Sequence, residues 1–382
     1  MNKNNLIYLD NNSTTRVDPR VFDAMAPYFH ELYGNPSSPH RYGLEASIAV
    51  EASRLMIKKL FGIEDRELYF TSSATESINI AIMGTAFANF SIKKHLITQA
   101  TEHPAVLEVF KSLESLGFRT TVLDVDGQGF VDPQAIKNAI EPDTLLVSIM
   151  AANNEIGTLQ DLVSIGKICE EMEVLFHSDL TQAAGRYAFN VSEIKLDMIS
   201  GGAHKIHGPK GIGYLGLNKT TKKIRINPLM YGGGQENGLS PGTLNVPLIV
   251  GLSKALEICE ENRTGETEFL NGLRQLFFTT LTENIEGVHL NGPGIRLLNN
   301  LSLRFDNISS NDLINGIKTL AFSAGSACAT GEGKPSHVLK AIGLNDSKIK
   351  STARFGFSRF NSGHEILTAA NEIVNFIKLK RK

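Results

Sequence analysis

The stretch LDMISGGAHKIHGPKGIGYL, residues 196–215, places a lysine between two apolar segments of the chain. The residues before it, 196–199, and those after it, 212–215, have the composition of short buried strands. The glycines on both sides of Lys205 indicate a tight turn between these strands. We therefore expect Lys205 to lie inside an α/β fold rather than on a solvated surface.

A lysine held in such a turn can lose its proton and form a Schiff base with a carbonyl group. Pyridoxal phosphate is anchored to proteins in this way, and it needs further groups from the chain. Asp179 ends the apolar run 174–178, which predicts a carboxylate at the carboxyl end of a strand, facing the ligand crevice and the pyridinium nitrogen. A helix N-cap is the alternative role for Asp179. Gln182 follows as a candidate donor to the phenolic oxygen of the cofactor.

A phosphate group needs an anion site, and residues 67–87 predict one. A strand-like run leads into the hydroxyl-rich turn 71–77 and then into an apolar helical pattern. Ser73 and Glu76 match a capping box, so the turn predicts a helix N-terminus that can bind an anion. The glycines of a Walker loop are absent from this segment.

A flat side chain over the cofactor ring is the third requirement. His103 follows the strand-like run 96–98, and its imidazole could stack on the ring and move protons. A histidine before a proline in a surface turn is the alternative interpretation.

These segments, in this order, resemble the NifS/IscS-type cysteine desulfurases, which are pyridoxal-phosphate enzymes of the class V aminotransferase group with fold type I. The resemblance covers nearly the whole chain. Its motifs lie at residues 8–15, 34–38, 71–77, 101–106, 153–157, 177–182, 204–213, 242–247, 323–328 and 354–355.

The resemblance also assigns binding roles to residues whose function no local sequence pattern indicates. It implies that Thr75, His204 and Thr243 hold the cofactor phosphate, with Thr243 coming from the neighbouring subunit of a homodimer. Asn35, Asn154 and Arg354 would bind the carboxylate of the substrate, and an arginine suits this role because its fork contacts both oxygens. Asn154 is a cofactor-binding candidate as well.

The three cysteines of the chain are too few and too scattered for a disulfide framework or a zinc site, and we expect no metal. Cys169 and Cys259 lie in helical patterns and are predicted to be small core residues. Cys328 lies among small polar residues, a composition that favours a mobile, exposed loop. A thiol there can ionise, attack sulfur and move away, although an incidental loop cysteine is the alternative.

The resemblance implies that L-cysteine is converted to L-alanine while its sulfur becomes a persulfide on Cys328. Lys205 and His103 are the candidates for moving protons. The persulfide would pass to an acceptor protein that serves iron–sulfur cluster assembly, tRNA thiolation or DNA phosphorothioation. The alternatives are a selenocysteine lyase and a catalytically weakened relative that acts as a partner-binding subunit.

Four residues depart from the family pattern near the phosphate. Gly202 stands where Ser or Thr is usual, and Asn237 and Ser240 stand where Arg is expected. Ser73 replaces the customary Gly. We expect a less positive phosphate end and weaker cofactor retention, with Ser200 as a candidate replacement for the missing hydroxyl.

Composition and pattern indicate an α/β enzyme without a membrane segment. The chain has 382 residues, 42% of them hydrophobic, and a net charge of −2, which implies no pull toward nucleic acid or membrane. The absence of an apolar run of spanning length, of a signal peptide and of a disulfide framework favours the cytoplasm. We expect a large cofactor-binding domain, 16–259, with a mixed, mostly parallel sheet flanked by helices. Residues 1–15 and 260–382 would form a smaller α+β domain carrying the sulfur-transfer loop.

Overall fold

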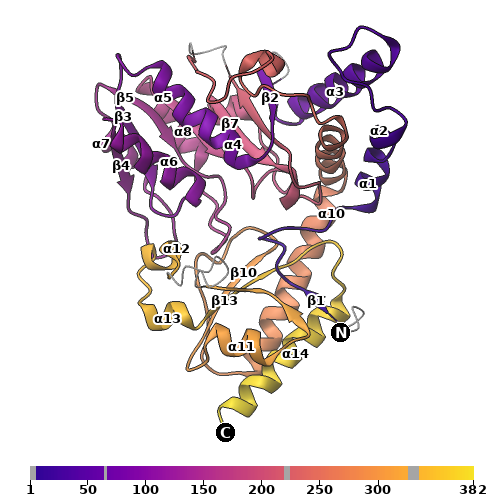
Figure 1. Ribbon diagram of the computed structural model, residues 1–382. Helices are drawn as coiled ribbons and strands as arrows, with labels where there is room; N and C mark the ends of the chain where they lie inside the picture. The colour runs from indigo at the N-terminus through magenta and orange to yellow at the C-terminus, as the bar shows by residue number, and fades with distance from the viewer. Residues whose placement is uncertain (1–5, 64–66, 219–223, 326–334) are drawn as a thin grey trace.

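The computed structural model describes residues 6–63, 67–218, 224–325 and 335–382 (Figure 1). Its main sheet has seven strands in the order β2-β8-β7-β6-β5-β3-β4. Only the pairings of β8 with β2 and β7 are antiparallel, which confirms the predicted mixed, mostly parallel sheet. The strands are β2 (Glu67–Thr71), β3 (His95–Gln99), β4 (Arg119–Leu123), β5 (Thr144–Ser148), β6 (Leu175–Asp179), β7 (Met198–Gly202) and β8 (Gly213–Leu217).

Successive side chains along each strand point to opposite sides of the sheet. Since the strands carry consecutive apolar residues, both faces of the sheet are apolar. On one face, Phe176 and Ile199 pack in a core with helices α3 (Arg41–Leu60) and α8 (Leu162–Glu171). The other face packs against α4 (Ala74–Asn79) and α6 (Pro104–Ser115). The shorter elements are α1 (Pro19–Met25), α2 (Pro27–His30), α7 (Pro133–Ala139), α9 (Val191–Ile194), η3 (Ala203–Lys205), η4 (Gln235–Gly238), α12 (His337–Ala341) and α13 (Asp346–Lys350).

The helix predicted over residues 78–87 is wound in three parts. The helix α4 passes into a π-helical turn, η2 (Ile80–Gly84), and then into α5 (Thr85–Ala88). The Gly84 carbonyl oxygen accepts a hydrogen bond from Asn227 N at 3.0 Å, and a Cβ on Gly84 would come within 2.5 Å of the Asn227 oxygen. This close backbone approach outside the helix accompanies the local widening, and periodicity alone does not reveal it.

A second, four-stranded sheet lies below the first in Figure 1 and has the order β12-β13-β10-β9. All of its pairings are antiparallel. Near it, the N-terminal strand β1 pairs in parallel with β11. These strands, with the helices packed on them, are β1 (Ile7–Tyr8), β9 (Val288–Leu290), β10 (Asn300–Phe305), β11 (Leu320–Ala321), β12 (Ser323–Ala324), β13 (Thr352–Gly356), α11 (Ser310–Gly316) and α14 (Gly363–Lys380).

One long helix, α10 (Val246–Asn284), joins the two sheets. Its first part, through Cys259, packs in the core of the large sheet. Its later residues, from Leu270 to Leu281, pack in the core of the small sheet. The polar segment 260–266, which directly follows the predicted domain boundary at residue 259, continues this helix between the two cores.

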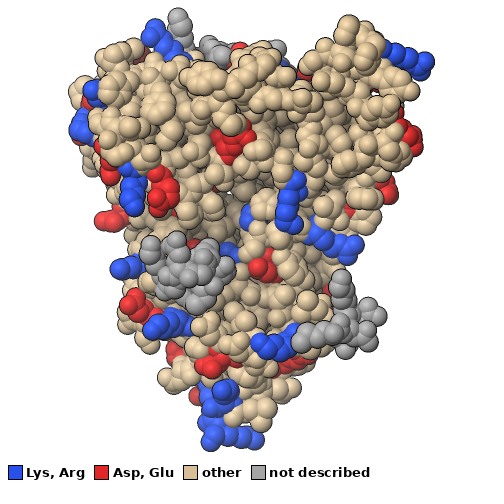
Figure 2. Space-filling view, in the orientation of Figure 1, with Lys and Arg blue, Asp and Glu red and all other residues tan. Residues whose placement is uncertain are grey.

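The charged side chains are interspersed on the face shown in Figure 2, with no large area of one sign. This distribution agrees with the small net charge of the chain. Within the described ranges, no helix combines the length and apolar character needed to cross a bilayer. Cys169 and Cys259 are buried in the core of the large sheet, as predicted.

Candidate active site

A cavity of about 430 Å³ lies where strands β2, β5, β6 and β7 end. The carboxyl ends of parallel strands are the usual place for a ligand in an α/β sheet. The residues predicted from the sequence that line this cavity are Thr75, His103, Asn154, Asp179, Gln182, His204 and Lys205.

Lys205 ends the short helix η3 directly after β7, as the glycine-rich turn predicts. Its Nζ donates hydrogen bonds to the backbone oxygens of Asn12 at 2.7 Å and Ser13 at 2.5 Å. Burial lowers the pKa of Lys205 to about 7, with Arg354 and Arg186 acting in the same direction. A large fraction of this amine is therefore neutral at pH 7 and can react as a nucleophile.

Asp179 is the last residue of β6 and only 6% of its surface is exposed. Its Oδ1 accepts hydrogen bonds from Thr181 N at 2.9 Å and from the Thr181 hydroxyl at 2.5 Å. The carboxylate thus stabilises the following turn and also lines the cavity. Gln182 Nε2 donates to Asn12 O at 2.9 Å, and its buried Oε1 has no hydrogen-bond partner among the described residues. Its predicted donation to a phenolic oxygen stays a prediction, because it requires a rotation of this amide.

His103 is the N-cap of α6, and its Nδ1 accepts a hydrogen bond from Ala105 N at 3.1 Å. The neutral ring therefore carries its proton on Nε2. The surrounding protein lowers the pKa of His103 mainly by removing solvent, and Lys205 and His337 act in the same direction against Asp179. The neutral ring at the cavity can donate a proton or stack on a flat ligand.

The N-terminus of α4 forms one end of the cavity through Ser73, Ala74 and Thr75. Ser73 Oγ accepts a hydrogen bond from Glu76 N at 3.1 Å, which confirms the first half of the capping box. The Glu76 carboxylate does not return to the Ser73 backbone but accepts from Ser72 N at 2.7 Å. The result is a helix start with side-chain hydroxyls at a cavity, which suits an anion.

Two basic side chains line the same cavity. Burial lowers the pKa of His204 to about 4, with Lys205 and Lys210 contributing in the same direction, so the imidazole is neutral at pH 7. Sequence analysis did not single out Lys210, although it lies in the decisive stretch and the turn through residues 208–209 returns it to the cavity. Lys210 adds a positive charge to this cavity, which Asn237 and Ser240 do not line.

Gly202 does not line the cavity itself, but the position has room for a small side chain beside Ala74 and Ile212, which do line it. A Cβ there would find its nearest neighbours, atoms of Ala74 and Ile212, at 3.5 Å, which is ordinary contact. Ser200 does not replace the missing hydroxyl, because it is fully buried and bonded to His177 Nε2 at 2.9 Å. Ser240 instead donates to Glu76 Oε1 at 2.9 Å.

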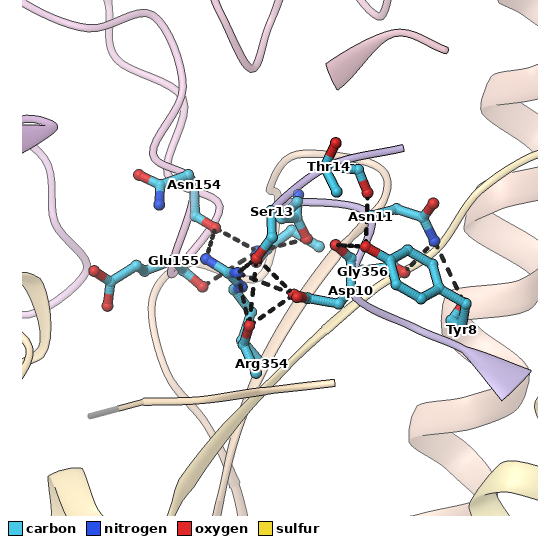
Figure 3. Close-up of polar contacts among 12 residues, drawn as sticks. Tyr8, Asp10, Asn11, Ser13, Thr14, Asn154, Glu155, Arg354 and Gly356 are labelled. Atoms are coloured by element: carbon cyan, nitrogen blue, oxygen red, sulfur yellow. Dashed lines mark hydrogen bonds and ion pairs between the residues drawn. The ribbon is translucent and has the colours of Figure 1, made fainter. Parts of the chain in front are cut away.

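Arg354 comes from β13 and lies among groups from distant parts of the chain (Figure 3). Its Nη1 donates to Asn154 O at 3.2 Å, so it is held beside a residue that lines the cavity. Its Nη2 contacts Asp10 and Ser13 of the N-terminal segment. Sequence analysis did not anticipate the contribution of Asp10 and Ser13.

Among the described residues, three of the predicted ones, Asn35, Thr243 and Arg354, do not line this cavity. Asn35 and Thr243 are exposed and do not line it, and Asn35 Oδ1 accepts a hydrogen bond from Ser37 N at 3.0 Å. Cys328 lies outside the described residues. The described part of one chain therefore brings together most of the residues predicted to bind the cofactor. Asn35 and Thr243 lie outside this cavity.

The groups present fit pyridoxal phosphate: an amine of lowered pKa, a buried carboxylate, an unpartnered amide oxygen and an anion site share one cavity. The family model for class-V aminotransferases matches residues 7–368. The cysteine desulfurase IscS of Rickettsia prowazekii (strain Madrid E) is 45% identical over 378 residues, covering 98% of this chain and 92% of that protein. The IscS of Rickettsia typhi (strain ATCC VR-144 / Wilmington) is 44% identical, with the same coverage.

Solved structures agree with this assignment. A NifS-like protein superposes with a TM-score of 0.90 and 36% identity, covering 98% of this chain and 100% of that one. DndA from Streptomyces lividans gives a TM-score of 0.78 and 33% identity, with 92% and 99% coverage. The fold, the cavity chemistry and these relatives lead to one conclusion: the chain belongs to the class-V aminotransferase family and is a pyridoxal-phosphate-dependent cysteine desulfurase.

Proposed function

We propose that Lys205 is the amine that anchors the cofactor and that Cys328 receives the sulfur of L-cysteine. The observation that carries the first part is the position of Lys205 Nζ, whose pKa is about 7, in a cavity that also holds the Asp179 carboxylate. When bound, pyridoxal phosphate supplies an electron sink that acidifies the α and β positions of an amino acid. The Asp179 carboxylate would hold the pyridinium nitrogen in its protonated form and so strengthen that sink.

The α4 N-terminus with Thr75, His204 and the charge of Lys210 would hold the phosphate. These groups lie at one cavity, and a helix start with hydroxyl groups suits an anion. His103 would stack on the ring of the bound cofactor and, with Lys205, would move protons, since both side chains line this cavity. The fall in the pKa of His103 leaves its ring neutral and carrying a proton on Nε2 at neutral pH.

Asn154 and Arg354 bind the carboxylate of L-cysteine, because Asn154 lines the cavity and Arg354 is bonded to its backbone oxygen. The Cys328 thiolate attacks the substrate sulfur, the carbon–sulfur bond breaks, and the carbon takes up a proton to give L-alanine. The sulfur stays on Cys328 as a persulfide and passes to a thiol of an acceptor protein by exchange.

A homodimer completes the site. Thr243 is exposed and outside its own cavity, which agrees with a role at the cavity of a partner subunit. An apolar stripe runs along one face of α3, where Leu44, Ile48 and Leu55 are 58–61% exposed. A second copy of the chain would cover this stripe and bring the two Thr243 residues to the two cavities.

We likewise propose that the chain divides into two domains between residues 259 and 260. Residues 1–15 belong to the smaller domain. It is supported by the change of core along α10 and by the pairing of β1 with β11. Buried thiols at Cys169 and Cys259 suit a reducing compartment, and we propose the cytoplasm.

The test is release of sulfide and L-alanine from L-cysteine and a reductant, by the wild type and by Cys328→Ser, with cofactor absorbance read in the same samples. Release by the wild type that is lost in Cys328→Ser, while the absorbance survives, is the expected result. A variant that retains full release would remove Cys328 from the mechanism. Loss of the absorbance in Lys205→Ala tests the anchor separately.

A further inference from the structure

Three side-chain oxygen atoms accept hydrogen bonds from one nitrogen of the Arg354 guanidinium, and Figure 3 labels the residues of two of them, Asp10 and Ser13. Arg354 Nη2 contacts Ser13 Oγ at 2.6 Å, Asp10 Oδ1 at 3.1 Å and Ser323 Oγ at 3.1 Å. We call Asp10, Ser13 and Ser323 the oxygen collar. Two of its members come from the segment after β1 and the third from β12, so they meet only through the fold.

The collar is itself cross-linked, so it forms a fixed group. Asp10 Oδ1 accepts hydrogen bonds from the hydroxyls of Ser13 at 2.9 Å and Ser323 at 2.7 Å. Asp10 also forms a β-bridge with Gly356, two residues beyond Arg354. The side chains of Asp10 and Arg354 are only 21% and 12% exposed, so these contacts are largely shielded from competing water.

The collar does not use all the donors of the arginine. A guanidinium has five N–H groups. The described contacts engage Nη2 and, through Asn154 O, Nη1. Nε is buried and has no hydrogen-bond partner among the described residues. A buried, unpartnered donor on a charged group is costly unless a ligand supplies the acceptor. A carboxylate oxygen is a strong acceptor for a single guanidinium N–H of this kind.

Ser13 connects this arginine with the amine of the cofactor site. Its backbone oxygen accepts a hydrogen bond from Lys205 Nζ, and its side-chain oxygen accepts one from Arg354 Nη2. Ser13 also lines the cavity. One residue therefore sets the spacing between the group that anchors the cofactor and the cation near Asn154. An amino acid needs this spacing to be fixed, because its amino group and its carboxylate share one carbon atom.

We infer that Asp10, Ser13 and Ser323 are positioning residues that hold Arg354 by Nη2 and leave its remaining donors for the carboxylate of the amino-acid substrate. The inference rests on the proposed function, because it requires Arg354 to bind that carboxylate. The collar acts through Arg354 and touches no reacting atom. It lowers the entropy lost when the carboxylate binds, since the guanidinium is already oriented.

The test uses the holoenzyme and two probes, L-alanine and cysteamine, whose binding is read from the change in cofactor absorbance. Cysteamine has the amine and thiol of cysteine but no carboxylate. Ser13→Ala and Ser323→Ala should each weaken L-alanine binding and raise KM for L-cysteine about threefold, and Asp10→Ala about tenfold. In every variant kcat should stay within about twofold, because the lost interaction acts on ground state and transition state alike.

The cysteamine affinity should not change in any variant. Asp10→Asn keeps an acceptor at Oδ1 and should restore most of the L-alanine affinity that Asp10→Ala loses. Ser351→Ala is the matched control: its hydroxyl donates to the backbone oxygens of Ser347 and Lys348, near β13 but away from the collar. It should match the wild type with both probes.

Equal weakening of L-alanine and cysteamine would show a general structural defect and overturn the inference. Unchanged L-alanine binding in all three alanine variants would overturn it as well. Failure of the proposed function is seen separately, as a wild type that releases neither sulfide nor L-alanine. The comparison of the two probes does not depend on turnover.

Discussion

Lys205 is the residue whose surroundings most change its chemistry. Burial removes the water that would solvate its ammonium group, and nearby arginines oppose the same charge. Its pKa falls to about 7 from 10.5, so the neutral amine becomes abundant near physiological pH rather than above pH 10. The backbone oxygens of Asn12 and Ser13 hold the amine without adding a counter-charge.

Covalent capture of pyridoxal phosphate by the apoenzyme should therefore depend on pH with a midpoint near 7. Below that pH the amine is protonated and unreactive, and above it the rate should level off. The measurement is the initial rate of the absorbance change between pH 5.5 and 9. Arg354→Gln removes a nearby positive charge and should move the midpoint upward. A midpoint near the ordinary lysine value would contradict the role given to burial.

Gly202 and its neighbour Gly201 offer a matched pair of substitutions. A serine at position 202 has ordinary contacts 3.5 Å away, whereas a Cβ at position 201 would lie 2.4 Å from the Tyr214 hydroxyl. Gly202→Ser should slow cofactor loss on dialysis, by about threefold or more for one added hydrogen bond, at unchanged thermal stability. Gly201→Ser should lower the melting temperature. Equal behaviour of the two variants would show that the space at position 202 has no relation to the cofactor.

At the scale of elements, a buried polar chain crosses three strands of the large sheet. Ser148 on β5 contacts His177 Nδ1 at 2.8 Å, and His177 Nε2 on β6 contacts Ser200 on β7 at 2.9 Å. All three residues are at most 1% exposed. Burial lowers the pKa of His177 to about 3, so the ring bridges the two hydroxyls as a neutral group.

His177→Ala should lower the unfolding free energy by about 2–4 kcal/mol, because it leaves two buried hydroxyls unpartnered and opens a cavity. It should also flatten the pH dependence of stability. Between about pH 6.5 and 3 the unfolded chain binds a proton at His177 that the folded chain does not, so stability falls as the pH falls. Urea unfolding at pH 7 and pH 5 measures both effects. His204 and His207 have lowered pKa values too, so the slope should decrease rather than vanish.

The sequence predicts the secondary-structure elements better than it predicts the tertiary contacts between them. The strands near Lys205 and Asp179 were located because apolar runs and glycine turns are local signals. The contact between Asp10 and Arg354 joins residues 344 positions apart, and no period in the sequence encodes it. The π-helical turn at Gly84 was missed for the same reason, since it accompanies a backbone contact from residue 227.

At the scale of the whole molecule, the apolar stripe on α3 predicts association of two chains. Ile48→Glu should place a charge in the interface, give a monomer in sedimentation at micromolar concentration, and weaken cofactor retention because Thr243 of the partner is lost. Leu379→Glu is the control, since Leu379 is 70% exposed at the far end of α14. Thr243→Ala should keep the dimer and still lose cofactor more readily. A wild-type monomer with tightly held cofactor would contradict the arrangement.

The position of the N-terminal segment has a consequence for biosynthesis. Asp10 is synthesised 344 residues before its partner Arg354 and still longer before Gly356. The large sheet is complete in sequence by Leu217 and can form while translation continues. Asn12 and Thr15 can already bond to residues 182–204 at that stage, but Asp10 must wait until more than 300 further residues have followed it. A chain released before residue 354 could build the cavity walls but would lack the cation to which we assign the substrate carboxylate.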